Sequence, residues 1–577
     1  MCQMQESSTA AALKLKYHKG VEIVKNKVKT MLSILVAAGM IFSVSACSQT
    51  QEAEQVQNTS KDPFGKYEKP VKISAVLGYG EPTDQNVPKS TTPENQAFNQ
   101  LLKDELNIEI EYLWTVPEAQ YEQKFSTAIA ANDLPDLLAL SQKDYEMLKE
   151  NDMLADLSEA YEYASDKLKE MVERDPGVLK SVTHDGKIYA IPRYSDVRTG
   201  TPLLWLRQDW MDKLGLSAPQ TWDDVIEIAR AFVEKDPDGN GENDTYGFGA
   251  TAKTLTPWGY GIKPMFMPYG SFIDQWIKDD SGKLVYGNIQ PETKTALESL
   301  AKMYQEGLLD KEIFTKDEEK VAEDIASGKI GMAVSEWWFG EVAVNDSCTA
   351  DPNAKWICME IPPMTEGGKP KICLNRQSIV TYYAINKKCK NPEAMIKSMN
   401  VYLEAENKYK DILTPENGHV WSWAPTIYLD PYEITTTFEK VNEAYESGNS
   451  EGITDEKQLS MLSHMAEYEQ YKNGEIPWDG TKLFGNLLAR VDKEGGWATT
   501  IQAVENADLY YNEFYGAPTE TMQDNGATLE KLTEETFIKI IAGEKDISAF
   551  DEYVTTWKNL GGDAITEEVN QWYAQNQ

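Results

Sequence analysis

The sequence predicts an α/β fold that is divided into two lobes. At 577 residues, the chain is longer than a single hydrophobic core usually supports. After residue 70, segments with the twofold periodicity of strands alternate with segments of helical periodicity. No internal repeat and no Pro- or Gly-rich linker divides this part of the chain. These observations favour two lobes, between which the chain crosses several times, rather than independent domains joined in a row.

The first five elements support the α/β assignment. Residues 71–77 and 108–114 read as strands, and residues 94–105 carry apolar side chains at helical spacing between them. Residues 120–131 read as a second helix, and residues 133–138 form a turn that leads into a short buried strand. This β-α-β-α-β order predicts a sheet with helices packed on it.

Helices dominate the later sequence. Thr221 and Asp224 have the spacing of a capping box, and apolar residues line one face of the helix that continues to Lys235. Further helices are expected at residues 291–306, 392–404, 455–472, 529–542 and 549–559.

The composition excludes several classes of protein. With 41% hydrophobic and 26% charged residues, the chain is neither disordered in bulk nor a polytopic membrane protein. Asp and Glu total 93 against 56 Lys and Arg, which gives a net charge of -37. This field repels phosphate backbones, so nucleic acid is not an expected partner. It also disfavours an anionic ligand unless local Arg residues offset it.

The first 47 residues read as an export signal. Lys25, Lys27 and Lys29 precede an apolar run at 31–44, which is shorter than the roughly 20 residues of a membrane-spanning helix. The run ends in Val44-Ser45-Ala46-Cys47, which resembles the lipobox of bacterial lipoproteins. We therefore expect a signal peptide at 1–46, lipidation of Cys47, for example with palmitate, and a flexible tether at 47–70. The protein would then be anchored by lipid at the extracellular face of the bacterial cell membrane. The alternative is an ordinary secretory signal in which Cys47 is incidental.

Four cysteines follow Cys47, and the sequence leaves their state open. An exported location permits disulfides, and four cysteines allow three pairings, none of which the sequence selects. A zinc site is the rival interpretation, but no C-x-x-C motif is present among Cys348, Cys358, Cys373 and Cys389.

Short motifs in a fixed order carry a resemblance to a known family. They are Asn132 to Asp136; Leu206 to Leu216 with Pro219, Thr221 and Trp222; Asp236 to Gly241 with Asp244; Gly328 to Met332; Lys390 to Ala394; and Gly561 to Asp563 with Glu567 to Trp572. In these motifs the chain resembles the extracellular solute-binding lipoproteins (family 1 type) of carbohydrate-uptake ABC transporters, the class that includes alginate-oligosaccharide-binding proteins.

The resemblance implies both a fold and a function. The fold is a two-lobe, periplasmic-binding-protein-like (type II) α/β fold with an interlobe hinge and a central ligand cleft. We assign residues 71–190 and 340–424 to the first lobe, and residues 191–339 and 425–577 to the second. The implied function is to capture a carbohydrate, in particular an oligosaccharide, and to deliver it as a monomer to the permease subunits of an ABC transporter.

An acidic loop has the ligand spacing of a calcium site. Hard Ca²⁺ prefers six to eight oxygen ligands, and this loop places them at positions 1, 3, 5, 7 and 9 with a glycine for the turn at position 6. Residue 245 is Thr, whereas the related lipoproteins often have an acidic residue there. We expect calcium to fix the loop rather than to switch function; the alternative is a solvated acidic turn. The predicted ligands are Asp236, Asp238, Asn240, Glu242 and Asp244.

Aromatic residues in turn-like contexts are the candidate ligand contacts, because sugars rest flat C–H faces on aromatic rings. The first-ranked group is Glu336-Trp337-Trp338, which follows a β-like run and, by the resemblance, lies near a hinge. The other candidates are Trp258 with Tyr260, Trp421 with Trp423, and three polar partners, Arg193, Asn375 and Arg376. For each aromatic group the alternative is a ring that packs beneath a loop.

No catalytic motif of a nucleophilic, metal-dependent or nucleotide-binding enzyme is recognisable in the sequence. We therefore expect a binding protein rather than an enzyme. Two suitably spaced carboxylates are enough for a glycosidase, so a surface polysaccharide hydrolase remains an alternative, as does a glycan-binding adhesin.

Overall fold

The computed structural model describes residues 61–576 except residues 81, 83–85, 254, 256–258, 377–378, 406, 481 and 517. The predicted signal peptide, Cys47 and the tether as far as residue 60 lie outside this range, as does Trp258. Within the described range, no helix combines the length and the apolar character that a membrane crossing requires.

The first lobe is built around parallel and antiparallel strand pairs. β1 (Val71–Tyr79) pairs in parallel with β2 (Ile108–Pro117), and β13 (Ile379–Ile385) lies antiparallel between β3 (Leu137–Leu140) and β6 (Ile191–Tyr194). Asp136 joins the two groups, because its Oδ2 accepts hydrogen bonds from the Ser74 amide at 2.9 Å and the Ser74 hydroxyl at 2.6 Å.

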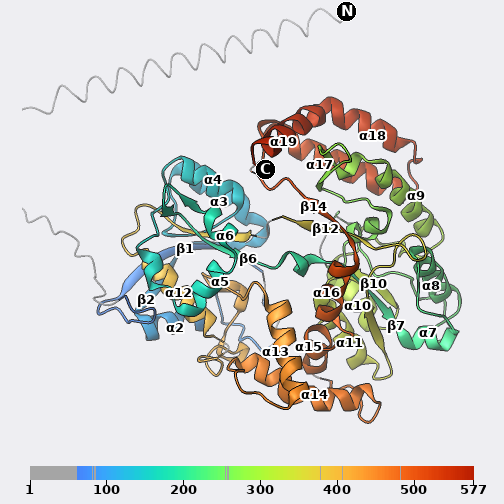
Figure 1. The fold of residues 1–577 in the computed structure, drawn as a ribbon, viewed down its shortest axis with the longest axis horizontal. Coiled ribbons are helices and arrows are strands. Elements are labelled where there is room, and N and C mark those ends of the chain that lie inside the picture. Colours follow the sequence, from blue (N-terminus) through green and yellow to red (C-terminus); the bar gives the residue numbers. More distant parts are fainter. Residues whose placement is uncertain are drawn as a thin grey trace, which may run out of the picture. The chain divides into compact units, whose positions relative to one another are not determined.

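Helices cover the strands of this lobe, and Figure 1 shows α2 and α12 beside β1 and β2. The buried faces of α2, α5 and α12 share one hydrophobic core, and Phe125 of α3 with Tyr145 of α4 belongs to another. The predicted β-α-β-α-β order is confirmed by β1, α2, β2, α3 and β3. The helices are α2 (Ala97–Leu106), α3 (Tyr121–Ala131), α4 (Gln142–Glu150), α5 (Asp166–Glu173), α6 (Pro176–Ser181) and α12 (Glu393–Leu403), and the strands β4 (Thr183–His184) and β5 (Lys187–Ile188) form a hairpin.

The second lobe has a fully buried central strand. β7 (Leu203–Arg207) lies antiparallel between β10 (Met332–Ser335) and β11 (Trp356–Met359). The predicted capping box is confirmed at α8, where Thr221 and Asp224 bond reciprocally. Helices of this lobe are α7 (Gln208–Leu214), α8 (Trp222–Glu234), α9 (Pro291–Gln305), α10 (Glu318–Ala326), α11 (Ala343–Ala350), α13 (Glu433–Ser447), α14 (Glu456–Lys472), α15 (Lys482–Arg490), α16 (Gly496–Asn506), α17 (Glu520–Ile541), α18 (Ala549–Trp557) and α19 (Asp563–Gln575). β8 (Trp276–Lys278) and β9 (Leu284–Tyr286) form a hairpin.

The observed pairing moves two boundaries of the sequence-based division. Residues 191–194 were assigned to the second lobe, but they form β6, which pairs with β13 of the first. Residues 340–424 were assigned to the first lobe, but β11 pairs with β7 of the second. The Trp356 ring also packs 5.7 Å from Phe339, in the same core as α11. The second segment of the first lobe therefore begins at β13, because the apolar strand 356–359 completes the sheet of the second lobe.

The connections between the lobes include paired strands. β12 (Lys371–Asn375), which precedes β13, pairs in parallel with β14 (Asp508–Asn512). Beyond this pair the Arg376 guanidinium makes two 2.8 Å hydrogen bonds to the Glu513 carboxylate. Another connection is η3 (Val197–Gly200), between β6 and β7, where the Asp196 amide donates to the Pro431 carbonyl at 2.8 Å.

The structure differs from the prediction at residues 61–70, which were expected to belong to a flexible tether. Tyr67 is 2% exposed, and its amide donates to the Leu106 carbonyl at 3.0 Å. The fully buried Lys397 ammonium donates to the Gly65 carbonyl at 2.6 Å and lies 4.8 Å from the centre of the Tyr67 ring. The segment is polar and lacks periodicity, and for this reason its sequence suggested a tether. One aromatic ring and a few backbone carbonyls hold it in place, and such contacts leave no periodic pattern in the sequence.

Candidate functional site

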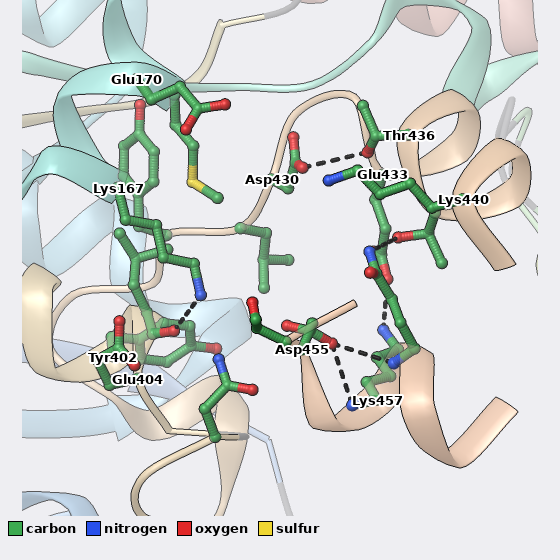
Figure 2. Close-up of a pocket in the computed structure, with 18 of the residues that line it drawn as sticks. Lys167, Glu170, Tyr402, Glu404, Asp430, Glu433, Thr436, Lys440, Asp455 and Lys457 are labelled. Atoms are coloured by element: carbon green, nitrogen blue, oxygen red, sulfur yellow. Dashed lines mark hydrogen bonds and ion pairs between the residues drawn. The ribbon is translucent and has the colours of Figure 1, made fainter. Parts of the chain in front are cut away.

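A cavity of about 740 Å³ is lined by elements of both lobes. Figure 2 shows the cavity with helix-borne side chains on opposite walls. One wall is formed by α5 and by the end of α12 with the residues that follow it, and the other by α13 and the start of α14. The segment 428–430 and Trp421 of η8 (Trp421–Trp423) complete the lining. The volume lies within the range of about 300–1,000 Å³ that is typical of small-molecule sites.

Most charged groups in this cavity are paired. The Arg174 guanidinium donates to Glu170 at 2.8 Å and to Asp430 at 3.2 Å, and the Lys457 ammonium donates to Glu433 at 2.6 Å. Burial alone would raise the pKa of Glu433, but the cations of Lys457 and Arg490 outweigh it, so the pKa lies below its usual value. These pairs place charged and hydrogen-bonding groups around the cavity.

Trp421 supplies an aromatic surface in this polar setting. Its ring is 38% exposed, whereas most large apolar side chains of the described part are buried. Edge contacts to Tyr402 at 5.7 Å and to His419 at 4.3 Å fix its orientation. An exposed indole among hydrogen-bonding side chains suits a ligand that has both apolar C–H faces and hydroxyl groups.

Trp423, two residues further on, lines a different cavity of about 770 Å³ together with Tyr79 and Thr115. It is only 3% exposed, and its indole N–H donates to the Gly80 carbonyl at 3.1 Å. Tyr79 ends β1 and meets the Trp423 ring edge to face at 5.7 Å. The predicted pair is therefore divided between two cavities, and Trp421 is the member with an exposed ring.

The first-ranked aromatic group is only partly assembled. Trp338 meets Tyr260 at 6.3 Å, and Glu336, 3% exposed, accepts a 3.3 Å hydrogen bond from the Gly259 amide. Trp337 lies apart from them, 5.4 Å from Trp497 and with the Arg490 guanidinium 4.8 Å from its ring centre. None of these side chains lines the cavity of about 740 Å³.

Glu336 has a perturbed carboxyl group. Burial raises its pKa to about 7, and the nearby Glu318 adds a smaller effect in the same direction. Its acceptor contacts, from Gly259 and from the Ser335 hydroxyl at 3.4 Å, are too long to offset the burial. A protonated carboxyl at this position is a hydrogen-bond donor as well as an acceptor.

The three predicted polar partners are placed at or near the connections between the lobes. Asn375 lines a smaller cavity of about 180 Å³ with residues 195–202 and 263–275. Arg376 is engaged by Glu513 and stacks 3.8 Å from the centre of the Tyr511 ring, so its guanidinium braces the strand pair. Arg193 is half-buried on β6, opposite Thr381. The structure does not bring these three into the cavity of about 740 Å³.

The predicted calcium loop is folded on itself. The Asp236 carboxylate accepts hydrogen bonds from the amides of Gly239 at 2.9 Å and Gly241 at 3.1 Å. The Asn240 side-chain amide donates to Asp238 at 2.7 Å and to Asp244 at 3.0 Å, so it bridges two of the predicted ligands. Across the described residues, no three acidic, His or Cys side chains converge on a metal position. The loop has the ligand types, but their present arrangement fits a cation only in part.

The cysteines that follow Cys47 are all free in the structure. Burial raises the pKa of each thiol, to about 12 for Cys348, Cys373 and Cys389. The predicted possibility of disulfides is therefore not realised in this structure.

The sequence reasoning missed the helical walls of the cavity. The polar face of α5 carries Lys167, and Arg174 follows at the end of this helix. The polar face of α13 carries Thr436 and Lys440. No motif marks them, because polar residues on an amphipathic helix are the ordinary pattern of a solvated face. Only the approach of the two lobes converts these faces into cavity walls.

Comparisons with known proteins agree with this architecture. A family described as bacterial extracellular solute-binding protein matches residues 89–409. Lipoprotein LipO of Bacillus subtilis (strain 168) is 26% identical over 564 residues, which are 94% of this chain and 98% of LipO. The polygalacturonan/rhamnogalacturonan-binding protein YtcQ of the same organism is 24% identical over 563 residues, 95% of this chain and 99% of YtcQ.

A solved structure shows the same fold. The alginate-binding protein AlgQ2, determined without calcium ion, superposes with a TM-score of 0.58 at 18% identity, over 89% of this chain and 100% of AlgQ2. The predicted two-lobe, periplasmic-binding-protein-like α/β fold is thereby confirmed. With a family match over more than half of its length, this chain belongs to the bacterial extracellular solute-binding proteins.

Proposed function

We propose that this protein is the substrate-binding component of a carbohydrate-uptake ABC transporter and that it captures an oligosaccharide in the cavity of about 740 Å³. The names of two similar proteins support a carbohydrate ligand: YtcQ is a polygalacturonan/rhamnogalacturonan-binding protein and AlgQ2 an alginate-binding protein. The observation that carries the proposal is the exposed Trp421 ring in a polar cavity lined by both lobes.

The cavity walls explain how binding would be signalled to a permease. A ligand that contacts α5 and α13 at once favours the arrangement in which the two walls face each other, because it binds that arrangement more tightly. The permease would then distinguish the loaded from the unloaded protein by the relative position of the lobes.

Lipid anchoring through Cys47 is part of the proposal. LipO, similar over 94% of this chain, is named a lipoprotein. Acyl chains contribute about 0.8 kcal/mol per buried CH₂ group, so two or three chains hold a protein at a membrane without a spanning helix.

A structural calcium ion in the acidic loop is a further part. The carboxylates of Asp236, Asp238 and Asp244 are the ligands that Ca²⁺ prefers, and the Asn240 amide that now bridges two of them supplies a carbonyl oxygen after a flip of its side chain. Ca²⁺ bound there would neutralise the repulsion between these carboxylates. Its role would be to fix the loop after α8.

Calorimetry of the soluble form that begins at Ser48 tests the proposed function. We expect at least one class of oligosaccharide to bind, and Trp421→Ala to weaken that binding about tenfold or more through loss of the stacking surface. Tyr445→Ala is the matched control, because Tyr445 is a similarly exposed aromatic residue, 36% exposed, that does not line the cavity. Equal affinities of Trp421→Ala and the wild type would remove the cavity from the proposal. Absence of binding across neutral and acidic oligosaccharides would overturn the carbohydrate ligand itself.

A further inference from the structure

Three of the five acids in the cavity lining form ion pairs with cations of the protein. Arg174 pairs with Glu170 and Asp430, and Glu433 receives hydrogen bonds from Lys457 at 2.6 Å and from Arg490 at 3.1 Å.

Asp455 is engaged differently. Its Oδ1 accepts hydrogen bonds from the backbone amides of Lys457 at 3.0 Å and Gln458 at 3.1 Å, which places the carboxylate at the N-terminus of α14. A carboxylate in that position is stabilised by the helix dipole. Of the acids in the lining, Glu404 and Asp455 are the two for which the described residues provide no ion pair.

Two lysines of the cavity lining have no acidic partner in the described part of the chain. Lys167, half-buried on α5, donates one hydrogen bond of 2.9 Å to the Leu403 carbonyl and keeps its other two donors. Lys440, on the exposed side of α13, has neither a hydrogen bond nor an ion pair from its ammonium group to the described residues. Figure 2 shows the two side chains reaching into the cavity from opposite walls, one from each lobe.

We infer that the ligand of this cavity is a glycan that carries carboxylate groups and that Lys167 and Lys440 determine this specificity; the inference rests on the proposed function. The lining carries five carboxylates and four cationic side chains, and Lys167 and Lys440 are the two cations whose ammonium groups lack a carboxylate partner among the described residues. Charge-assisted hydrogen bonds from ammonium to carboxylate are about twice as strong as neutral ones. A neutral sugar offers only hydroxyl groups to the same donors.

The charge of the whole chain makes these lysines necessary for such a ligand. The net charge of -37 repels an anionic glycan at long range. The repulsion between exposed charges is largely screened beyond the Debye length of about 8 Å at physiological salt, whereas contacts inside the cavity are screened less. Local cations on both walls therefore decide whether an acidic glycan is accepted.

Binding of paired acidic and neutral glycans tests the inference. The probes are oligomers of galacturonate, mannuronate, guluronate and glucuronate, each with its methyl ester, which keeps the ring and the linkage but removes the charge. We expect the acid of at least one pair to bind the Ser48–Gln577 form about tenfold or more tightly than its ester, with a difference that shrinks as NaCl is raised. Lys167→Gln should weaken the acid about tenfold and Lys440→Gln about threefold, because Lys440 is more exposed.

The control variant is Lys311→Gln, which removes an exposed lysine outside the cavity and should leave both affinities unchanged. Equal binding of an acid and its ester, or loss of acid and ester in equal proportion in Lys167→Gln, would overturn the inference. Binding of neutral oligosaccharides alone would also overturn it while the proposed function stands. Absence of binding by every glycan, charged or neutral, would remove the proposed function as well.

Discussion

Tyr67 is predicted to hold the N-terminal strap, residues 61–70, onto the first lobe. The ring is 2% exposed, lies under the Lys397 ammonium, and donates its hydroxyl to Glu393 at 2.6 Å. Tyr67→Ala removes the ring and leaves the buried Lys397 without its nearest aromatic partner. Tyr67→Phe keeps the ring and loses only the hydroxyl bond.

The expected magnitude follows from these contacts. Truncation of a buried aromatic side chain to Ala typically costs about 3–5 kcal/mol of unfolding free energy, and loss of a single hydrogen bond about 1 kcal/mol. With an unfolding entropy of about 2.1 cal/mol/K per residue, a loss of about 4 kcal/mol lowers Tm by about 4 °C if the whole folded body unfolds together. If the first lobe unfolds separately, the same loss lowers the Tm of that lobe by about 10 °C, because fewer residues share it.

Differential scanning calorimetry of the wild type, Tyr67→Ala, Tyr67→Phe and Tyr445→Ala measures these shifts. The expected order of Tm is wild type close to Tyr445→Ala, then Tyr67→Phe, then Tyr67→Ala. A Tm of Tyr67→Ala within about 1 °C of the wild type would contradict this prediction. The strap would then contribute nothing to stability, and residues 61–70 would behave as the tether that the sequence suggested.

Three further predictions concern titration, thiols and calcium. Burial raises the pKa of Glu336 to about 7 in the folded protein, against a usual value of 4.5, so the unfolded state releases this proton first as pH rises. Between pH 5 and pH 8 the wild type should therefore lose up to about 3 kcal/mol of unfolding free energy relative to Glu336→Gln. A difference in Tm between the two proteins that does not change with pH would contradict the burial of this carboxyl. In the Ser48–Gln577 form a thiol reagent should label no cysteine quickly under native conditions and four in denaturant; fewer than four would reveal a disulfide. EGTA should lower the Tm of the wild type but not of Asp238→Ala, and an unchanged wild-type Tm would remove calcium from the account.

The sequence predicted the fold where local patterns are strong. The strand and helix periodicities of residues 71–138 and the capping box at Thr221 correspond to elements of the structure, because each depends on neighbouring residues alone. The lobe boundary near residue 340 was misplaced, because the membership of β11 depends on its pairing with β7, which is distant in sequence.

The candidate site was harder to predict for the same reason. Trp337 and Trp338 are adjacent in sequence, yet one packs against Trp497 and the other against Tyr260. Trp421, in a group ranked lower, is the predicted residue that lines the cavity between the lobes. Lys167 and Lys440 are separated by more than half of the folded chain, and only the tertiary structure places them on facing walls.

The segment before β1 illustrates a different limit. Its residues lack periodicity because they form neither helix nor strand, and they are held instead by Lys397 and Asn400, which donate to the carbonyls of Gly65 at 2.6 Å and Pro63 at 3.1 Å. Contacts of this kind to backbone carbonyls leave no mark on the sequence of the segment that accepts them.

A crystal structure with a bound acidic oligosaccharide is the most direct test of the central claim that the cavity between α5 and α13 binds a glycan. The predicted result is a sugar ring against the Trp421 indole and a carboxylate within hydrogen-bond distance of the Lys167 or Lys440 ammonium. A glycan bound instead beside Trp338 and Tyr260, with the cavity of about 740 Å³ containing only water, would contradict it.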